Sequence, residues 1–458
     1  MRPHHLTIGG RRGVDGTSTV PMQQPLDALD KACLAATRAP WSSFAPTWKL
    51  DLSGVIDLSL MQRALDAAVT RTPWCAASIV NGAWVVPERP RLLISSAVTE
   101  RAVLDRFIDV ATEPVMEVLL LRHSETRATL LFHQHHVLAD GRAFLRFLGD
   151  FFHAWRSLES GASARTGVVL RRRQVEVVSA SGLARAWVFF RGAFVSLGEL
   201  ARAVLAPVAT LPSNVGTDYS GSNATLHHDV PLERLERWRA PRTTLGLSTN
   251  DLLAGALLRA LSTWSGQTGT THTLFFPIDA RPREGFESFA NHLTNLQLRW
   301  RTDATTTPLE YAHHVHREAA KHLDAKWPWL RVLFDAFVGQ VTPLPAMQRA
   351  LLDQRRLVTN VSFSNLLPLG TPDADASGRW STRHCTVERL RITTPCVPPQ
   401  AVNVTVARSG AAACFNFNFK ASAISEARVA ALVNDFQRAL DELDAALISS
   451  LPTNSIRR

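Results

Sequence analysis

The chain has 458 residues, of which 46% are hydrophobic and 20% are charged. This composition excludes a disordered protein. Because a chain of this length is longer than those that usually fold around a single hydrophobic core, we expect two lobes. The net charge of +10 favours anionic partners unless the excess is only a solvated surface. The sequence contains no zinc finger, RNA-recognition motif or dense basic helix that would indicate nucleic-acid binding. No apolar run is long enough to span a bilayer.

The two ends of the chain and its cysteines further restrict the class of protein. Residues 1–24 carry charges and glycines without the apolar core of a signal peptide, so we expect a disordered extension and a cytoplasmic protein. Residues 451–458 are predicted to be a disordered tail. The five cysteines are odd in number and lack Cys-x-x-Cys spacing, which supports neither a disulfide framework nor a zinc knuckle.

The first predicted lobe, residues 25–211, opens with alternating strand and helix signals. A strand is expected over 48–54, and apolar residues at helical spacing predict a helix from Leu58 to a stop at Thr72–Pro73. Strands over 75–79 and 84–86 follow, joined by an Asn-Gly turn.

The most informative stretch is an apolar, strand-like run over 130–134 that ends in His135 and His136, followed at fixed spacing by Asp140 and Gly141. A neutral imidazole at the end of a buried strand is a natural general base near pH 7. The plainer alternative is that the histidines are satisfied strand-end residues and Asp140 caps a helix, which the aromatic spacing over 144–155 predicts.

The stretch 186–211 is apolar but interrupted by charges, which favours packing across the lobe interface; peripheral membrane contact is the alternative. The sequence Leu-Pro-Ser-Asn-Val-Gly over 211–216 is the best candidate for the crossing to a second lobe, residues 212–450.

In the second lobe, helices are predicted over 249–264 and 425–447, and strands over 273–278, 361–365, 402–407 and 413–419. The first of these strands leads to Arg281, and a Phe-Ala-Asn piece ends at Asn291. Strands mixed with helices in both halves predict an α/β protein of two lobes, each a mixed sheet with flanking helices.

The pattern His-His-x-x-x-Asp-Gly resembles the signature of the chloramphenicol acetyltransferase-like superfamily, which includes peptide-synthetase condensation domains and wax-ester synthases. The resemblance covers residues 25–447 and is strengthened by Arg281, Asn291 and the Ser364–Asn365 pair occurring in order. The Asp-Phe-Gly-Trp-Gly signature of the plant branch is absent. The resemblance implies two chloramphenicol acetyltransferase-like lobes with an active-site channel between them.

The resemblance also implies that an acceptor attacks a thioester directly and takes over its acyl group. His136 would be the general base that takes the proton from a hydroxyl or amine acceptor, with His135 beside it. Asp140 would pair with Arg281 to hold the loop, and the amide of Gly141 is a candidate oxyanion donor. The residues expected to line the channel are Ser364, Asn365 and Asn291.

The resemblance implies no permanently bound cofactor and a donor that is either acyl-CoA or a phosphopantetheinyl carrier protein acting in trans. Both donors are acidic, which suits the basic chain, and we expect a monomer. A non-catalytic condensation-like module that recruits a partner enzyme is the alternative. His133 and His135 alternate on one strand face, but no third zinc ligand is identifiable, so no metal is predicted.

Overall fold

The computed structural model describes residues 22–37, 44–97, 99–163, 190, 194, 221–279, 281, 288–303, 305–324, 361–367, 374–375, 378–396, 400 and 402–450. The predictions for residues 1–21, for the crossing at 211–216 and for the tail at 451–458 lie outside this part of the chain, as does the stretch 186–211 apart from two residues. None of the described helices combines the length and apolar character that a bilayer span requires.

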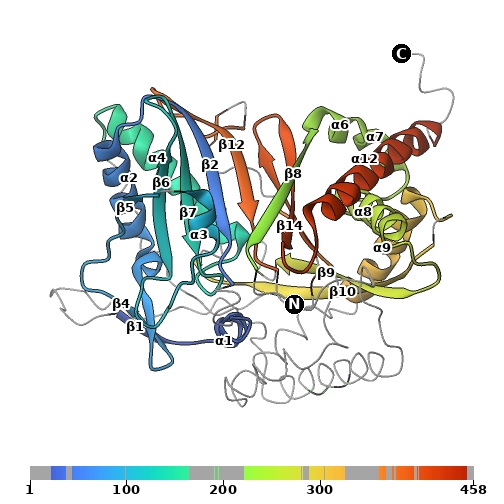
Figure 1. Cartoon of the computed structure of the whole chain (residues 1–458), viewed down its shortest axis with the longest axis horizontal. Coiled ribbons are helices and arrows are strands. Elements are labelled where there is room, and N and C mark those ends of the chain that lie inside the picture. The colour runs from blue at the N-terminus through green and yellow to red at the C-terminus, as the bar shows by residue number, and fades with distance from the viewer. Residues whose placement is uncertain are drawn as a thin grey trace, which may run out of the picture.

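Within the described residues, the first lobe is built on a five-stranded sheet of order β12-β2-β7-β6-β5 (Figure 1). Its strands are β2 (Thr47–Gly54), β5 (Ile94–Ser96), β6 (Met116–Arg122), β7 (Arg127–Gln134) and β12 (Cys385–Thr393). The central strand, β7, carries the apolar run that precedes the two histidines and is buried from its second residue onward. A buried central strand places the motif at the middle of the lobe.

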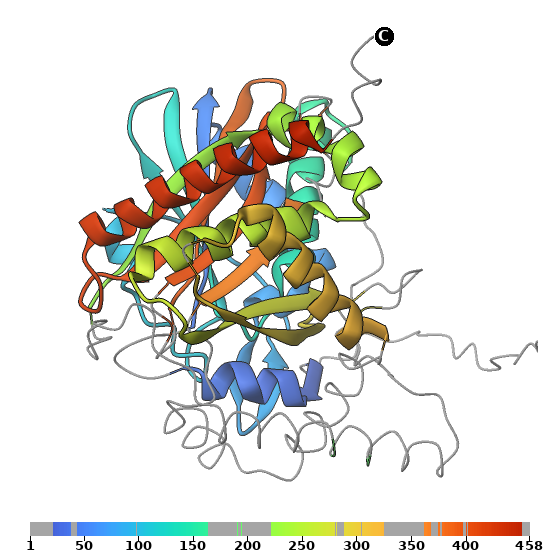
Figure 2. The same ribbon diagram turned by 90° about the vertical axis from the view of Figure 1, so that its right-hand side faces the viewer.

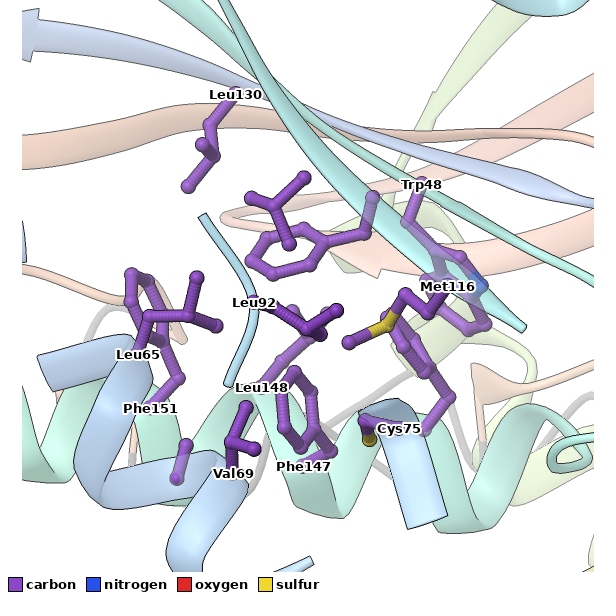
Figure 3. Packing of buried hydrophobic residues seen from close by; sticks show 14 of the residues in the cluster. Trp48, Leu65, Val69, Cys75, Leu92, Met116, Leu130, Phe147, Leu148 and Phe151 are labelled. Carbon is purple, nitrogen blue, oxygen red and sulfur yellow. The ribbon is translucent and has the colours of Figure 1, made fainter. Parts of the chain in front are cut away.

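Alternation along β2 and β7 separates an apolar face of this sheet from a polar one. Helices α2 (Leu58–Arg71) and α4 (Gly141–Glu159) cover the apolar face. Figure 3 shows Phe147 and Phe151 of α4 packed beneath Trp48 and Leu130 of the sheet. The polar face includes Thr47, Lys49 and Asp51 of β2.

A three-stranded sheet of order β1-β4-β3 flanks the first lobe, within the described residues: β1 (Met22–Pro25), β3 (Ser78–Val80) and β4 (Ala83–Val86). The predicted hairpin is confirmed: Asn81 and Gly82 both have positive φ, 50° and 75°, as a type I′ turn requires. Two predictions need correction. Residues 22–24, predicted to be disordered, pair with β4 as part of β1. Residues 75 and 76, predicted to begin a strand, belong instead to a 3-10 helix, η1 (Pro73–Ala76), whose first residue is a proline.

The second lobe has a sheet of order β10-β9-β11-β13-β14-β8 in the described part of the chain. The strands are β8 (Asn223–Pro231), β9 (Thr271–Asp279), β10 (Leu293–Arg301), β11 (Val361–Asn365), β13 (Val402–Ser409) and β14 (Ala412–Lys420). Helices α8 (Thr249–Ser265), α9 (Pro308–Asp324) and α12 (Glu426–Ser449) cover one face of this sheet (Figure 2). The shorter helices are α1 (Ala28–Ala35), α3 (Glu100–Leu104), α6 (Leu232–Arg237) and α7 (Arg239–Thr244).

Strand β12 joins the lobes. It follows β11 in the chain, yet it pairs antiparallel with β2 of the first sheet. Its far side is bound by the second sheet, where Asn416 accepts a hydrogen bond from the backbone of Ile392 (3.2 Å) and Asn418 accepts one from Thr394 (3.1 Å). The region 212–450, predicted as one lobe, therefore contributes an edge strand to the other lobe. The mixed α/β architecture itself is confirmed.

Candidate active site

The two histidines of the motif are fixed by backbone hydrogen bonds beyond the end of β7. The N–H of His135 donates to the carbonyl of Val115 (2.8 Å), and the N–H of His136 donates to the carbonyl of Phe44 (2.9 Å). The next turn closes when Leu138 donates to the carbonyl of His135 (3.0 Å). These bonds turn the chain from the strand toward α4.

The side chain of His135 is fully buried. Its Nδ1 accepts from the N–H of Val137 (3.1 Å), so its proton lies on Nε2, which is 2.7 Å from the hydroxyl of Thr37. That hydroxyl in turn donates to the carbonyl of Cys33 (3.1 Å). Burial, aided by the neighbouring His136 and His133, lowers the pKa of His135 to about 3, so the ring is neutral at pH 7.

His133 lies two residues earlier on β7, and both of its ring nitrogens are also occupied. Nδ1 is 2.8 Å from the hydroxyl of Thr47, and Nε2 is 3.2 Å from the carbonyl of Arg106. Burial lowers its pKa to about 4. Because His133 and His135 use all four ring nitrogens internally, neither presents a free lone pair to a ligand, and no cluster of three metal-ligating side chains occurs among the described residues.

His136 differs from both because its two ring nitrogens face different surroundings. The ring is half-buried and stacks on Phe44, with centroids 4.9 Å apart and planes 10° apart. Nδ1 is buried without a hydrogen-bond partner among the described residues. Nε2 makes no hydrogen bond to those residues either, but it is not a buried atom. The accessible nitrogen of the motif is therefore Nε2 of His136.

Burial lowers the pKa of His136, which keeps the ring neutral near pH 7. Its own backbone carbonyl, the carboxylate of Asp140 and the side chain of Asn291 act in the opposite direction. For Nε2 to act as a base, the proton of the neutral ring must lie on the buried Nδ1.

Asp140 anchors the start of α4. The carboxylate is fully buried and accepts from the backbone N–H groups of Ala143 (3.0 Å) and His292 (2.8 Å). It also accepts from Nη2 of Arg281, 3.0 Å from Oδ1 and 2.9 Å from Oδ2. Burial alone would raise the pKa of Asp140, but Arg281 and the backbone donors hold it below its usual range.

A second ion pair runs beside the first with the charges reversed. Arg142, two residues after Asp140, binds Asp279 at the end of β9 (2.5 Å). Asp279 also accepts from Nη1 of Arg281 (3.0 Å). Each lobe thus contributes one aspartate and one arginine to a four-residue network, of which Arg142 and Asp279 are not evident from sequence patterns.

Gly141 is the first residue of α4, and it is small because the second lobe packs on it. A Cβ built there would lie 2.8 Å from Cδ2 of Leu366 and 3.0 Å from its Cδ1. Leu366 directly follows β11 and is held by a backbone hydrogen bond to Val406 (2.8 Å). The glycine therefore permits contact between the lobes immediately beside the motif.

Asn291 is 3% exposed and braces the motif from the second lobe. Its Nδ2 donates to the carbonyls of His136 (2.7 Å) and Val137 (3.1 Å). Its Oδ1 is buried without a hydrogen-bond partner among the described residues. Asn291, predicted to line a channel, is placed by the structure on the backbone of the candidate base.

Ser364 and Asn365 are half-buried at the end of β11, just before the leucine that packs on Gly141. Asn365 donates through Nδ2 to the side chain of Asn250 at the start of α8, and its Oδ1 accepts from the N–H of Leu367 (2.9 Å). The described contacts place this pair beside the motif without joining it to His136. Its role in a channel stays a prediction.

No protein-family model and no curated protein matches the sequence. Solved structures do resemble this chain in fold. The first condensation domain of the calcium-dependent antibiotic synthetase is 15% identical to this chain, with a TM-score of 0.68. The match covers 94% of this chain and 97% of the condensation domain. The trichothecene 15-O-acetyltransferase of Fusarium sporotrichioides is 13% identical with a TM-score of 0.68, covering 93% and 95%.

A third similar structure is the epimerization domain from the third module of tyrocidine synthetase B. It is 14% identical with a TM-score of 0.66 and covers 95% of this chain and all of its own, 100%. At these identities the likeness establishes the fold. The chain has the two-lobed, chloramphenicol acetyltransferase-like fold of condensation domains, as the His-His-x-x-x-Asp-Gly resemblance predicts.

Proposed function

We propose that this protein is an acyltransferase that moves an acyl group from a thioester donor to a hydroxyl or amine acceptor, with His136 as the general base. One observation carries the proposal: of the six ring nitrogens on His133, His135 and His136, only Nε2 of His136 is neither buried nor hydrogen-bonded among the described residues. Burial keeps that imidazole neutral, as a general base requires.

The proposed chemistry needs no other titratable group. Nε2 of His136 takes the proton from the acceptor as its oxygen or nitrogen attacks the thioester carbon and forms a tetrahedral intermediate. The carbon–sulfur bond then breaks, and the leaving thiolate takes the proton from Nε2. The products are an ester or amide and a free thiol, and His136 returns to its neutral state.

Asp140 supports this step from a distance. Its buried pair with Arg281 fixes the turn that carries His136, so the imidazole is held in place before substrate arrives. The donor class follows from charge as well as from fold: a chain of net charge +10 suits CoA or an acidic carrier protein. The two donors are distinguished by experiment.

The test mixes the protein with a panel of acyl-CoAs, or acyl groups on phosphopantetheine, and a panel of alcohols and amines. Release of free thiol is followed with a chromogenic thiol reagent, and product is identified by mass spectrometry. His136→Ala is expected to lower turnover by roughly 10²- to 10⁴-fold. His313→Ala, on α9 of the second lobe, is the matched control and retains the wild-type rate.

A folded His136→Ala variant with near-normal turnover would refute the assignment of the base. A wild-type protein that captures a partner enzyme but forms no product with any donor would favour the non-catalytic module.

A further inference from the structure

Phe44 has a backbone conformation that its residue type rarely adopts. Its φ is +47°, in the left-handed region that bulky side chains avoid. Among the described non-glycine residues, only Asn81 shares a positive φ, and there the type I′ hairpin accounts for it. Phe44 lies three residues before β2, and no hairpin turn among the described residues includes it. Such strain persists only where the surrounding structure imposes it.

Two of the contacts of Phe44 reach the same neighbour, His136. Its carbonyl accepts the backbone N–H of His136 (2.9 Å), and its ring lies nearly parallel to the imidazole at a centroid distance of 4.9 Å. The same residue therefore holds both the main chain and the side chain of His136. Asn291 binds the carbonyl of His136 from the second lobe (2.7 Å), so the base is held from two directions.

We propose that Phe44 is a positioning residue for His136, and that its strained backbone is maintained because it lets one residue supply both contacts. This inference rests on the proposed function. Stacking restricts rotation of the imidazole, and a base held in one orientation avoids the large rate losses that small misplacements cause. The aromatic ring also excludes water from one face of the imidazole.

Two substitutions separate the ring from the backbone. Phe44→Asn removes the ring but suits a positive φ, because asparagine visits the left-handed region readily. Phe44→Gly removes the ring and relieves the strain altogether. Both keep the carbonyl that accepts from His136. Phe44→Tyr retains an aromatic ring and is the conservative comparison.

The first readout is kinetic, with acetyl-CoA and thiol release. Phe44→Asn and Phe44→Gly are expected to lower kcat on the order of 10- to 100-fold, with a smaller change in KM for acetyl-CoA. Neither variant is expected to unfold at lower urea concentration than wild type, because the strain is removed. Phe44→Tyr stays closer to wild type than either.

The second readout needs no turnover. Nitrogen-15 NMR of histidine-labelled full-length protein reports the pKa and the protonated nitrogen of His136, with His136→Gln used for assignment. Because burial is the largest influence that lowers the pKa of His136, loss of the ring raises that pKa. The other titratable groups named here, His135, Asp140 and Arg281, are unchanged in these variants.

The outcomes distinguish this inference from the function on which it rests. If His136→Ala abolishes turnover while Phe44→Asn leaves kcat, the His136 pKa and its protonated nitrogen unchanged, Phe44 has no positioning role and the function stands. If His136→Ala retains turnover, the function fails, and the NMR result still decides whether Phe44 controls the imidazole.

Discussion

Arg281 closes over Asp140 from the opposite lobe, with one guanidinium nitrogen within 3.0 Å of both carboxylate oxygens. The side chain of Arg281 is 4% exposed and that of Asp140 is fully buried. Arg281 further donates to the carbonyl of Ala290 (2.9 Å), which precedes Asn291. A single buried pair thus links the start of α4, the end of β9 and the segment that braces His136.

Asp140→Asn is predicted to destabilise the protein strongly. The substitution keeps a helix-capping side chain but removes the buried carboxylate from Arg281, which keeps only the ion pair with Asp279. Loss of one partner of a buried pair costs about 3–5 kcal/mol of unfolding free energy. Urea unfolding at pH 7.5 measures this change.

Arg142→Gln is the matched control, because it breaks the parallel pair with Asp279, in which Arg142 is 51% exposed. Exposed pairs contribute about 1 kcal/mol or less. Equal losses from Asp140→Asn and Arg142→Gln would show that burial does not set the value of the Asp140–Arg281 pair.

His135→Gln is predicted to reduce the sensitivity of stability to acid. The folded-state pKa of His135 is about 3, below the unfolded value of about 6.5. As pH falls through 6.5 the unfolded chain takes up a proton that the folded chain refuses, so stability is lost progressively down to about pH 3. Between pH 7.5 and 5 this amounts to about 2 kcal/mol.

Unfolding free energies of wild type and His135→Gln, measured in urea at both pH values, give the difference in slope. Glutamine is chosen because it keeps an amide donor in place of the ring nitrogen that lies 2.7 Å from the hydroxyl of Thr37. An unchanged slope would mean that the ring of His135 takes up a proton in the folded state.

Local patterns were sufficient to predict the parts of the fold that depend on neighbours in sequence. The helix that starts after Asp140 and the Asn-Gly hairpin at 81–82 both form as expected. Strand β12 could not be assigned to its sheet in this way, because its pairing with β2 joins residues more than 300 positions apart. Alternation along a strand identifies a buried face but not the partner strand.

The residues of the candidate site likewise fall into those that the sequence predicts and those that only the folded chain shows. The spacing of the motif singles out His136 and Asp140, and the family resemblance adds Arg281. Phe44 carries no such signal, because a phenylalanine in the left-handed region matches no sequence preference. The bracing of the His136 carbonyl by Asn291 depends on docking of the second lobe, which no local pattern determines.

Gly141→Ala is predicted to destabilise the protein by about 1–3 kcal/mol, because the new methyl group meets the side chain of Leu366 at 2.8 Å. The cause is tested with a double-mutant cycle in which Leu366→Val shortens the opposing side chain. If the clash is responsible, the loss of unfolding free energy in the double variant is smaller than the sum of the two single losses. The difference is expected to be about 0.5 kcal/mol or more. Additive losses would place the origin of the effect elsewhere in the start of α4.

Asn291→Asp is predicted to move the acid limb of the rate profile to higher pH. The substitution removes two hydrogen bonds to the carbonyls of His136 and Val137 and places a carboxylate beside the candidate base. A negative charge stabilises the protonated imidazole, so the pKa of His136 rises. A general base works only when deprotonated, so kcat/KM falls most at pH 6–7 and recovers as the pH is raised.

Asn291→Ala separates the two effects, because it removes the hydrogen bonds without adding charge. It is expected to cost about 1–3 kcal/mol through the unsatisfied carbonyls while leaving the acid limb closer to wild type. Asn403→Asp, on β13 of the second sheet, is the matched control, because its side-chain oxygen is likewise buried without a partner in the described part of the chain. A shift of the acid limb in Asn403→Asp equal to that in Asn291→Asp would trace the effect to altered stability, whereas a shift confined to Asn291→Asp identifies His136 as the group whose deprotonation sets the rate.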